Sequence, residues 1–104
     1  MNNRMDKVNE ELKKALGKII SQELKDPKLT GLITVTGVKT TPDLKYSRVF
    51  ISMIGCKSQK ENIAILKKSS GFIRSLIAKE VNLKFTPELV FEFDESIEYR
   101  FKDW

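Results

Sequence analysis

The residues best suited to chemistry in this sequence are cations on either side of a run of small residues. Lys67 and Lys68 precede Ser69-Ser70-Gly71, and Arg74 follows within one helical turn. Glycine costs roughly 1 kcal/mol relative to alanine inside a helix, so Gly71 predicts a break or kink between two helical segments. A helix that starts after such a break presents unpaired N–H groups, and a guanidinium is a rigid fork of donors for phosphate. The segment therefore predicts an anion-binding site.

Arg74 is the strongest single candidate in this segment. It lies between the apolar Ile73 and Leu76 on the second middle helix, so we expect Arg74 to face outward beside the break. Replacement by glutamate would then weaken binding and leave the fold intact. The alternative is an ordinary surface ion pair, for example with Glu80. Lys67 and Lys68 also have an alternative explanation, because lysines late in a helix interact favourably with its dipole.

Further cations could extend this site over the first helix, the hairpin and the end of the second middle helix. The set is Lys7, Lys14, Lys18, Lys45, Arg48, Lys79 and Lys84. For each residue alone, a solvated surface is the alternative, whereas together they would supply the non-specific attraction that dominates RNA affinity. Tyr46 and Phe50 share a strand face with Arg48, and they either stack on bases or pack against the sheet.

The composition indicates one globular domain over residues 1–104, with residues 95–104 as a short tail. The chain has 104 residues, of which 40% are hydrophobic and 32% are charged, as in ordinary folded proteins. The net charge of +5 is uneven: residues 1–87 carry 17 basic and 8 acidic side chains, and residues 88–104 carry 2 and 6. A balance of +9 against −4 favours a body that attracts polyanions.

The chain lacks the residues that several classes of protein function need. The chain has no histidine and a single cysteine, Cys56, so the commonest general base and the usual zinc ligands are missing. The glycines form no phosphate-binding or dinucleotide pattern. We therefore expect no catalytic residue, metal, cofactor or small-molecule substrate. Without a signal peptide or an apolar run of roughly 20 residues, the chain is expected to be cytoplasmic and not membrane-bound.

The first half of the chain predicts a helix followed by a β-hairpin. Apolar residues recur every three or four positions from Arg4 to Lys25, and Asp26-Pro27 stops this helix. Leu32–Lys39 alternates as a strand, with a bulge expected at Gly37. Turn residues then lead into a second strand, Tyr46–Ile54.

The second half predicts two consecutive helices and a last strand. Ser58 and Glu61 have the spacing of a capping box, so a helix should begin just after Ser58. The predicted core contacts of the helix pair are Ile63, Leu66, Phe72, Ile73, Leu76, Ile77 and Val81. A strand from Glu88 to Asp94 precedes the tail, whose apolar residues are spaced for docking. The fold class is α+β, with order α–β–β–α–α–β and helices on one face of a three-stranded sheet.

This order, with particular residues in it, resembles the ribosome-binding factor A family over nearly the whole chain. The matching segments are Lys25-Asp26-Pro27-Lys28, Ile33-Thr34-Val35-Thr36-Gly37-Val38, Asp43-Leu44-Lys45-Tyr46-Ser47-Arg48-Val49, Gly71-Phe72-Ile73-Arg74-Ser75-Leu76, Pro87-Glu88-Leu89-Val90-Phe91 and Asp94-Glu95-Ser96. No single segment is diagnostic, but their number and order are specific.

The resemblance implies a type II KH-like fold in which an Ala-x-Gly kink replaces the GxxG loop of RNA-binding KH domains. Here Ser69-Ser70-Gly71 stands at the kink, so serine replaces the usual alanine. The resemblance also implies a non-enzymatic factor, monomeric when free, that binds the immature 30S subunit and its 16S ribosomal RNA. Its implied role is late maturation and growth in the cold.

Two alternatives stay open. One is a generic single-stranded RNA-binding module of KH type, and the other is a protein-interaction domain whose basic surface only keeps it soluble. RNA contact would make affinity fall steeply with ionic strength.

Overall fold

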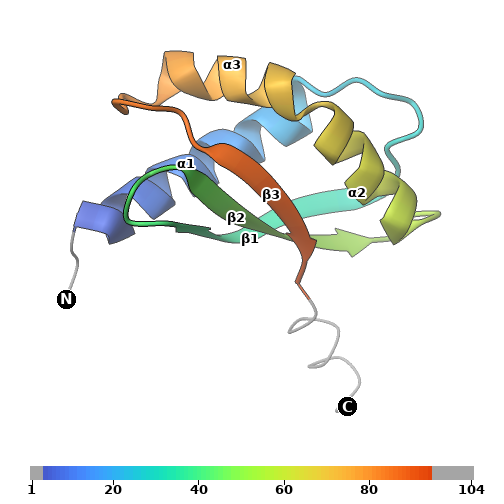
Figure 1. Ribbon diagram of the computed structural model, residues 1–104. Helices are drawn as coiled ribbons and strands as arrows, with labels where there is room; N and C mark the ends of the chain where they lie inside the picture. Colours follow the sequence, from blue (N-terminus) through green and yellow to red (C-terminus); the bar gives the residue numbers. More distant parts are fainter. Residues whose placement is uncertain (1–3, 95–104) are drawn as a thin grey trace, which may run out of the picture.

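Three helices cover one face of a three-stranded sheet in the computed structural model, which describes residues 4–94 (Figure 1). The predicted order of elements and the packing of the helices on one face of the sheet are confirmed. The opposite face of the sheet carries no helix in this described range. The tail over residues 95–104, with its expected docking residues, lies outside the described residues.

Helix α1 (Arg4–Gln22) buries the apolar stripe that its sequence predicts. The buried residues are Leu12, Ala15, Leu16, Ile19 and Ile20. The helix ends three residues before the predicted boundary at Lys25. The reason is local: the N–H groups of Glu23 and Leu24 both donate to the Ile19 carbonyl, at 2.8 and 3.2 Å, so the chain turns out of helical geometry ahead of Pro27.

Strands β1 (Leu32–Thr40) and β2 (Tyr46–Ile54) form the predicted antiparallel hairpin. The register shifts between Val35 and Gly37, which confirms the predicted bulge. The bulge lets both halves of β1 place apolar side chains on the helix-covered face, because one extra residue resets the alternation.

The hairpin turn is held by its own polar groups. The carboxylate of Asp43 accepts from the Thr41 hydroxyl at 2.6 Å and from the Lys45 N–H at 3.0 Å. These bonds, chiefly the one from Thr41, hold the pKa of Asp43 below its usual value. Leu44 has a φ of 62°, a left-handed conformation that costs a leucine roughly 1 kcal/mol.

After the hairpin, helices α2 (Gln59–Lys68) and α3 (Ser70–Glu80) cross over the sheet to strand β3 (Glu88–Phe93). The predicted cap is confirmed, since the Ser58 side chain accepts from the Glu61 N–H at 3.1 Å. Strand β3 pairs with β2 in parallel, which gives the strand order β1-β2-β3.

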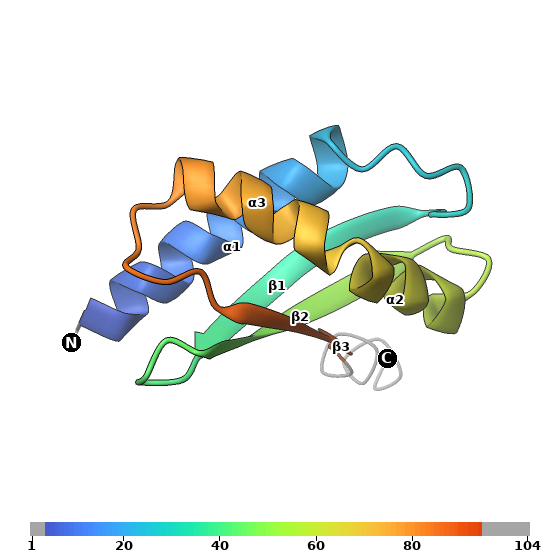
Figure 2. The same cartoon turned by 45° about the horizontal axis from the view of Figure 1, so that its top comes forward.

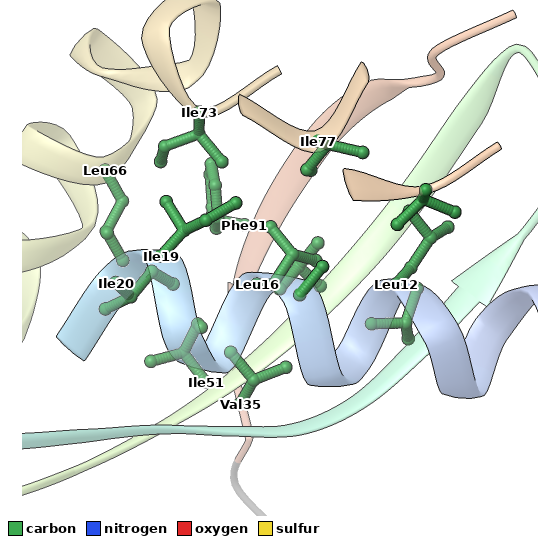
Figure 3. Close-up of a cluster of buried hydrophobic side chains, with 14 of the residues drawn as sticks. Leu12, Leu16, Ile19, Ile20, Val35, Ile51, Leu66, Ile73, Ile77 and Phe91 are labelled. Atoms are coloured by element: carbon green, nitrogen blue, oxygen red, sulfur yellow. The ribbon is translucent and has the colours of Figure 1, made fainter. Parts of the chain in front are cut away.

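The hydrophobic core lies between α1, the bent helix pair and the sheet. Figure 3 shows Leu66, Ile73 and Ile77 from the pair on one side of α1, and Val35 and Ile51 from the sheet on the other. Their burial is the main favourable term for the fold.

One predicted core residue is not in the core. The side chain of Phe72 is 50% exposed. Ile73, the next residue, is fully buried, and consecutive positions on a helix point about 100° apart. The first turn of α3 therefore cannot place both side chains against α1.

Candidate nucleic-acid interface

The helix break predicted near Ser69–Gly71 is present, and Figure 2 shows the bend between α2 and α3. Ser69 alone separates the two helices, with φ −89° and ψ 2°. Its N–H donates to the Ile65 carbonyl at 2.9 Å, and its own carbonyl accepts from the Ile73 N–H at 2.9 Å. One residue thus ends the first helix and begins the second.

The start of α3 has the features of an anion-binding site. The Ser69 side chain makes no capping hydrogen bond, and the first turn of α3 contains no acidic residue. N–H groups at a helix start carry partial positive charge and favour anions. Ser69 and Ser70 are half-buried, whereas Gly71 is exposed, and a Cβ added at Gly71 would meet no atom within 4 Å. The backbone is therefore open to close approach.

Lys67 and Lys68 form the last turn of α2 and are both exposed. The described residues provide no ion pair for either side chain. Their ammonium groups are thus available to an anion near the break.

The prediction that Arg74 faces outward is wrong. The side chain is half-buried, and it donates through Nε to the Pro87 carbonyl at 3.0 Å and through Nη2 to the Thr86 carbonyl at 2.8 Å. The structure does not show the alternative pair with Glu80 either; Glu80 pairs with Lys18 at 3.3 Å. Arg74 fastens the segment before β3 to α3, so it positions the chain as well as carrying charge.

The predicted lysines of α1 do not form a uniform stripe. Lys7 and Lys14 are exposed, but Lys18 is paired with Glu80. Glu11 lines the same hollow as Lys14 and Lys18, between α1 and the end of α3. The carboxylates of Glu11 and Glu80 in this hollow weaken the attraction of that surface for phosphate.

Arg48 lies on the face of the sheet away from the helices. Its guanidinium donates to both carboxylate oxygens of Glu92, at 2.5 and 2.9 Å, and lies 5.1 Å from the centre of the half-buried Phe50 ring. The hydrogen bonds from Arg48 hold the pKa of Glu92 below its usual value, and the same bonds raise the pKa of Arg48. The structure does not bring Arg48 together with the helix break.

The remaining predicted cations lie at the other end of α3. Lys79 is in its last turn and Lys84 in the segment that follows; both are exposed, as is Lys45 in the hairpin turn. The 11 residues of α3 separate this group from the break by roughly 16 Å, at 1.5 Å per residue. The structure therefore does not gather the predicted cations into one site: Lys67 and Lys68 lie at the break, and Lys79 and Lys84 lie apart from it.

Asn62 was missed by the sequence analysis. Its side chain is fully buried, donates through Nδ2 to the Thr30 carbonyl at 2.8 Å, and accepts through Oδ1 from the Thr30 N–H at 3.2 Å. It fastens the segment before β1 to α2. The sequence does contain one indication of this role, because Asn62 is a polar residue at a core position of a helix, one residue before Ile63.

The part of the chain that the structure describes contains neither a candidate metal-binding cluster nor a candidate membrane-spanning helix. Among residues 4–94, no three histidine, cysteine, aspartate or glutamate side chains gather in a way that could hold a metal ion. None of the described helices has the length and apolar character needed to cross a bilayer.

Comparison with known proteins agrees with this architecture. The family model for ribosome-binding factor A matches residues 4–102. A relative named ribosome-binding factor A from Clostridium botulinum strain Eklund 17B is 45% identical over 100 residues, covering 94% of this chain and 86% of the relative.

Solved structures match as well. The crystal structure of ribosome-binding factor A from Thermus thermophilus superimposes with a TM-score of 0.78, at 25% identity, over 86% of this chain and 93% of that one. A homology model of Thermus thermophilus ribosome binding factor A, as fitted into the cryo-EM map of its 30S complex, matches with a TM-score of 0.70, at 25% identity, over 84% and 91% of the two chains. The predicted KH-like fold is confirmed, and the chain belongs to the ribosome-binding factor A family.

Proposed function

We propose that this chain binds the 30S ribosomal subunit through its 16S ribosomal RNA and acts as a non-enzymatic factor in late maturation, with a role in growth in the cold. Family membership supports the proposal, as does the Thermus thermophilus relative whose coordinates were fitted into a 30S complex. We further propose that it works in the cytoplasm, is monomeric when free, and needs no metal, cofactor or small-molecule substrate.

The helix break is the observation that carries this proposal. It combines an uncapped helix start, an exposed glycine backbone and the two exposed lysines Lys67 and Lys68. Backbone N–H groups and lysines together suit a phosphodiester, which is an anion with several acceptor oxygens. Such contacts read the shape of folded RNA and not its base sequence.

The other predicted cations have graded roles in the proposal. Those exposed and without an ion pair among the described residues are flanking phosphate contacts: Lys7, Lys14, Lys45, Lys79 and Lys84. Lys18 and Arg48 reach RNA only by giving up an acidic partner. Arg74 acts chiefly by holding Thr86 and Pro87 in place.

Co-sedimentation with purified 30S subunits, at low and moderate salt, tests the proposal. Replacing Lys67 and Lys68 together by alanine should weaken co-sedimentation and lower the slope of log affinity against log salt by roughly 1.5, because each lysine releases about 0.7 to 0.9 counterions. Replacing Lys57, just before α2, and Lys60, in its first turn, removes the same charge and serves as the control. Equal losses for both pairs would mean that net charge, and not the break, drives binding.

A short unstructured RNA distinguishes this function from generic single-strand binding. A 30S-specific factor should bind the assembled particle far more tightly than the oligonucleotide at equal salt. Equal affinity for both would favour the generic module. Binding to 30S that does not change with salt would favour a protein-interaction domain.

A further inference from the structure

A second hollow lies away from the helix break, between the hairpin turn and the segment that enters β3. In both cartoon views, the β1–β2 turn and the link from α3 to β3 lie at the same end of the molecule (Figures 1 and 2). The hollow measures about 390 Å³, within the range of sites for small organic groups. Its lining residues are Asp43, Leu44, Lys45, Tyr46, Phe85, Thr86 and Glu88.

The two walls of this hollow are fixed relative to each other. The Glu88 N–H donates to the Lys45 carbonyl at 2.8 Å, which joins the hairpin to the entrance of β3. Arg74 holds the Thr86 and Pro87 carbonyls from the other side. One main-chain hydrogen bond and two from the Arg74 side chain thus hold the hollow, so its shape does not depend on the ligand. Pre-organisation of this kind lowers the cost of binding.

Two aromatic side chains in the hollow are left exposed by the fold. Phe85 is 62% exposed and Tyr46 is 47% exposed, and neither belongs to the core cluster. Folding alone therefore does not explain an aromatic residue at either position. Exposed aromatic faces on a rigid support are the usual platform for unpaired bases, which stack on them.

The charged side chains around the hollow suit the phosphates and the base edge of a nucleotide. Lys84 places its ammonium 5.6 Å from the centre of the Phe85 ring, and Lys45 lines the opposite wall. Both cations can meet the phosphates that flank a stacked base. The Glu88 carboxylate has no hydrogen bond or ion pair within residues 4–94. It offers an acceptor for an amino group on a base edge.

We propose that the hollow between Tyr46 and Phe85 binds one unpaired nucleobase that carries an exocyclic amino group, within single-stranded RNA. Tyr46 and Phe85 stack on the base, Lys45 and Lys84 contact the adjacent phosphates, and Glu88 accepts a hydrogen bond from the amino group. Arg74 is a positioning residue, since it fixes the segment that carries Phe85. The inference rests on the proposed function only in taking ribosomal RNA as the source of the base.

The test uses the full chain and five-nucleotide RNAs of adenine, cytosine or uracil. NMR should show the ring protons of Tyr46 and Phe85 shifting when the adenine or cytosine oligonucleotide is added. Phe85→Ala and Tyr46→Ala should each weaken this binding at least about fivefold, the lower end of what loss of one stacked base produces. Phe85→Trp should retain binding, because it keeps a stacking surface.

Two further variants isolate the roles of Glu88 and of apolar exposure. Uracil lacks an exocyclic amino group, so the uracil oligonucleotide should bind less well than the other two. Glu88→Gln should reduce the difference in affinity between the uracil oligonucleotide and the other two. Leu32→Ala removes an apolar side chain with 64% exposure at the far end of the sheet, and it should leave oligonucleotide binding unchanged. Equal binding of all three RNAs by the parent chain would overturn the role of Glu88.

Failure of this inference is distinguishable from failure of the proposed function. If the parent chain does not co-sediment with 30S subunits, the function fails whatever the oligonucleotides do. If it co-sediments and the Tyr46 and Phe85 variants bind oligonucleotides as the parent does, only the nucleobase site is overturned. Loss of 30S binding by Phe85→Ala without loss of oligonucleotide binding would assign the hollow to a ribosomal protein instead.

Discussion

Replacing Gly71 by alanine should raise the stability of the fold and yet weaken binding at the helix break. A Cβ there would meet nothing within 4 Å, and the backbone does not require a positive φ. Alanine favours a helix over glycine by roughly 0.5–1 kcal/mol. Because Gly71 lies in the first turn of α3, the lower value of about 0.5 kcal/mol applies. For a domain of this size, Tm should rise by about 2–4 °C.

Binding should change in the opposite direction. If a phosphate approaches the N–H groups at the start of α3, a methyl group at position 71 occupies part of that approach. We expect affinity for the 30S subunit to fall on the order of tenfold, which corresponds to about 1.4 kcal/mol. A variant that is more stable and yet binds less well cannot be explained by unfolding.

Two other glycines serve as controls for the same substitution. Gly17 lies inside α1 with open space around it, so Gly17→Ala should raise Tm at least as much as Gly71→Ala and leave 30S binding unchanged. Gly31 has a φ of 81°, and an added Cβ would lie 2.6 Å from both the Cys56 nitrogen and the Ile54 oxygen. Left-handed strain of roughly 1 kcal/mol and backbone displacement of about 1–3 kcal/mol should destabilise Gly31→Ala by about 2–4 kcal/mol.

Thermal unfolding followed by circular dichroism, together with 30S co-sedimentation, measures both effects. Parental affinity for Gly71→Ala would show that the backbone at the break does not contact the subunit. A lower Tm for Gly71→Ala would show that the space around position 71 is not open. Either result would refute the reasoning that links the exposed glycine to binding.

Three further predictions concern stability. Arg74→Ala removes both bonds to the segment before β3 and should cost about 2 kcal/mol in urea unfolding, whereas Lys68→Ala should stay within roughly 0.5 kcal/mol of the parent; equal midpoints for the two would contradict the positioning role. Asn62→Ala leaves the N–H and carbonyl of Thr30 unpaired and should cost about 2–3 kcal/mol, with hydrogen exchange at the Thr30 amide accelerated. Because Arg48 lowers the pKa of Glu92 in the folded chain, this carboxylate stabilises the fold above its unfolded pKa, and the contribution is lost as pH falls through the lowered value. Arg48→Gln should therefore reduce the loss of stability below about pH 4.5, and an unchanged acid profile would exclude the pair as a contributor.

Local signals were enough to predict the elements of this fold. The spacing of apolar residues in α1, the cap at Ser58 and the bulge at Gly37 each depend on residues a few positions apart. The helix break is equally local, since small residues and glycine weaken a helix wherever it is packed. Phe72 shows the limit, because helix periodicity alone did not place it correctly relative to the core.

Contacts between segments far apart in the sequence determine the partners of the polar side chains. The pair of Arg48 and Glu92 spans 44 positions of the sequence, and it forms because β3 lies parallel to β2. Arg74 faces two carbonyls because α3 returns over the start of β3. Neither arrangement has a local signal, since a cation's partner depends on which chain segment packs beside it.

The sequence by itself determined the order of helices and strands, the family and the presence of a break near Ser69–Gly71, because each follows from short-range patterns or from matched segments. Only the tertiary structure decided the strand order, the separation of the other cations from the helix break and the hollow between Tyr46 and Phe85. These features arise where segments some 40 residues apart are packed together, and packing of that kind is set by burial of the whole core.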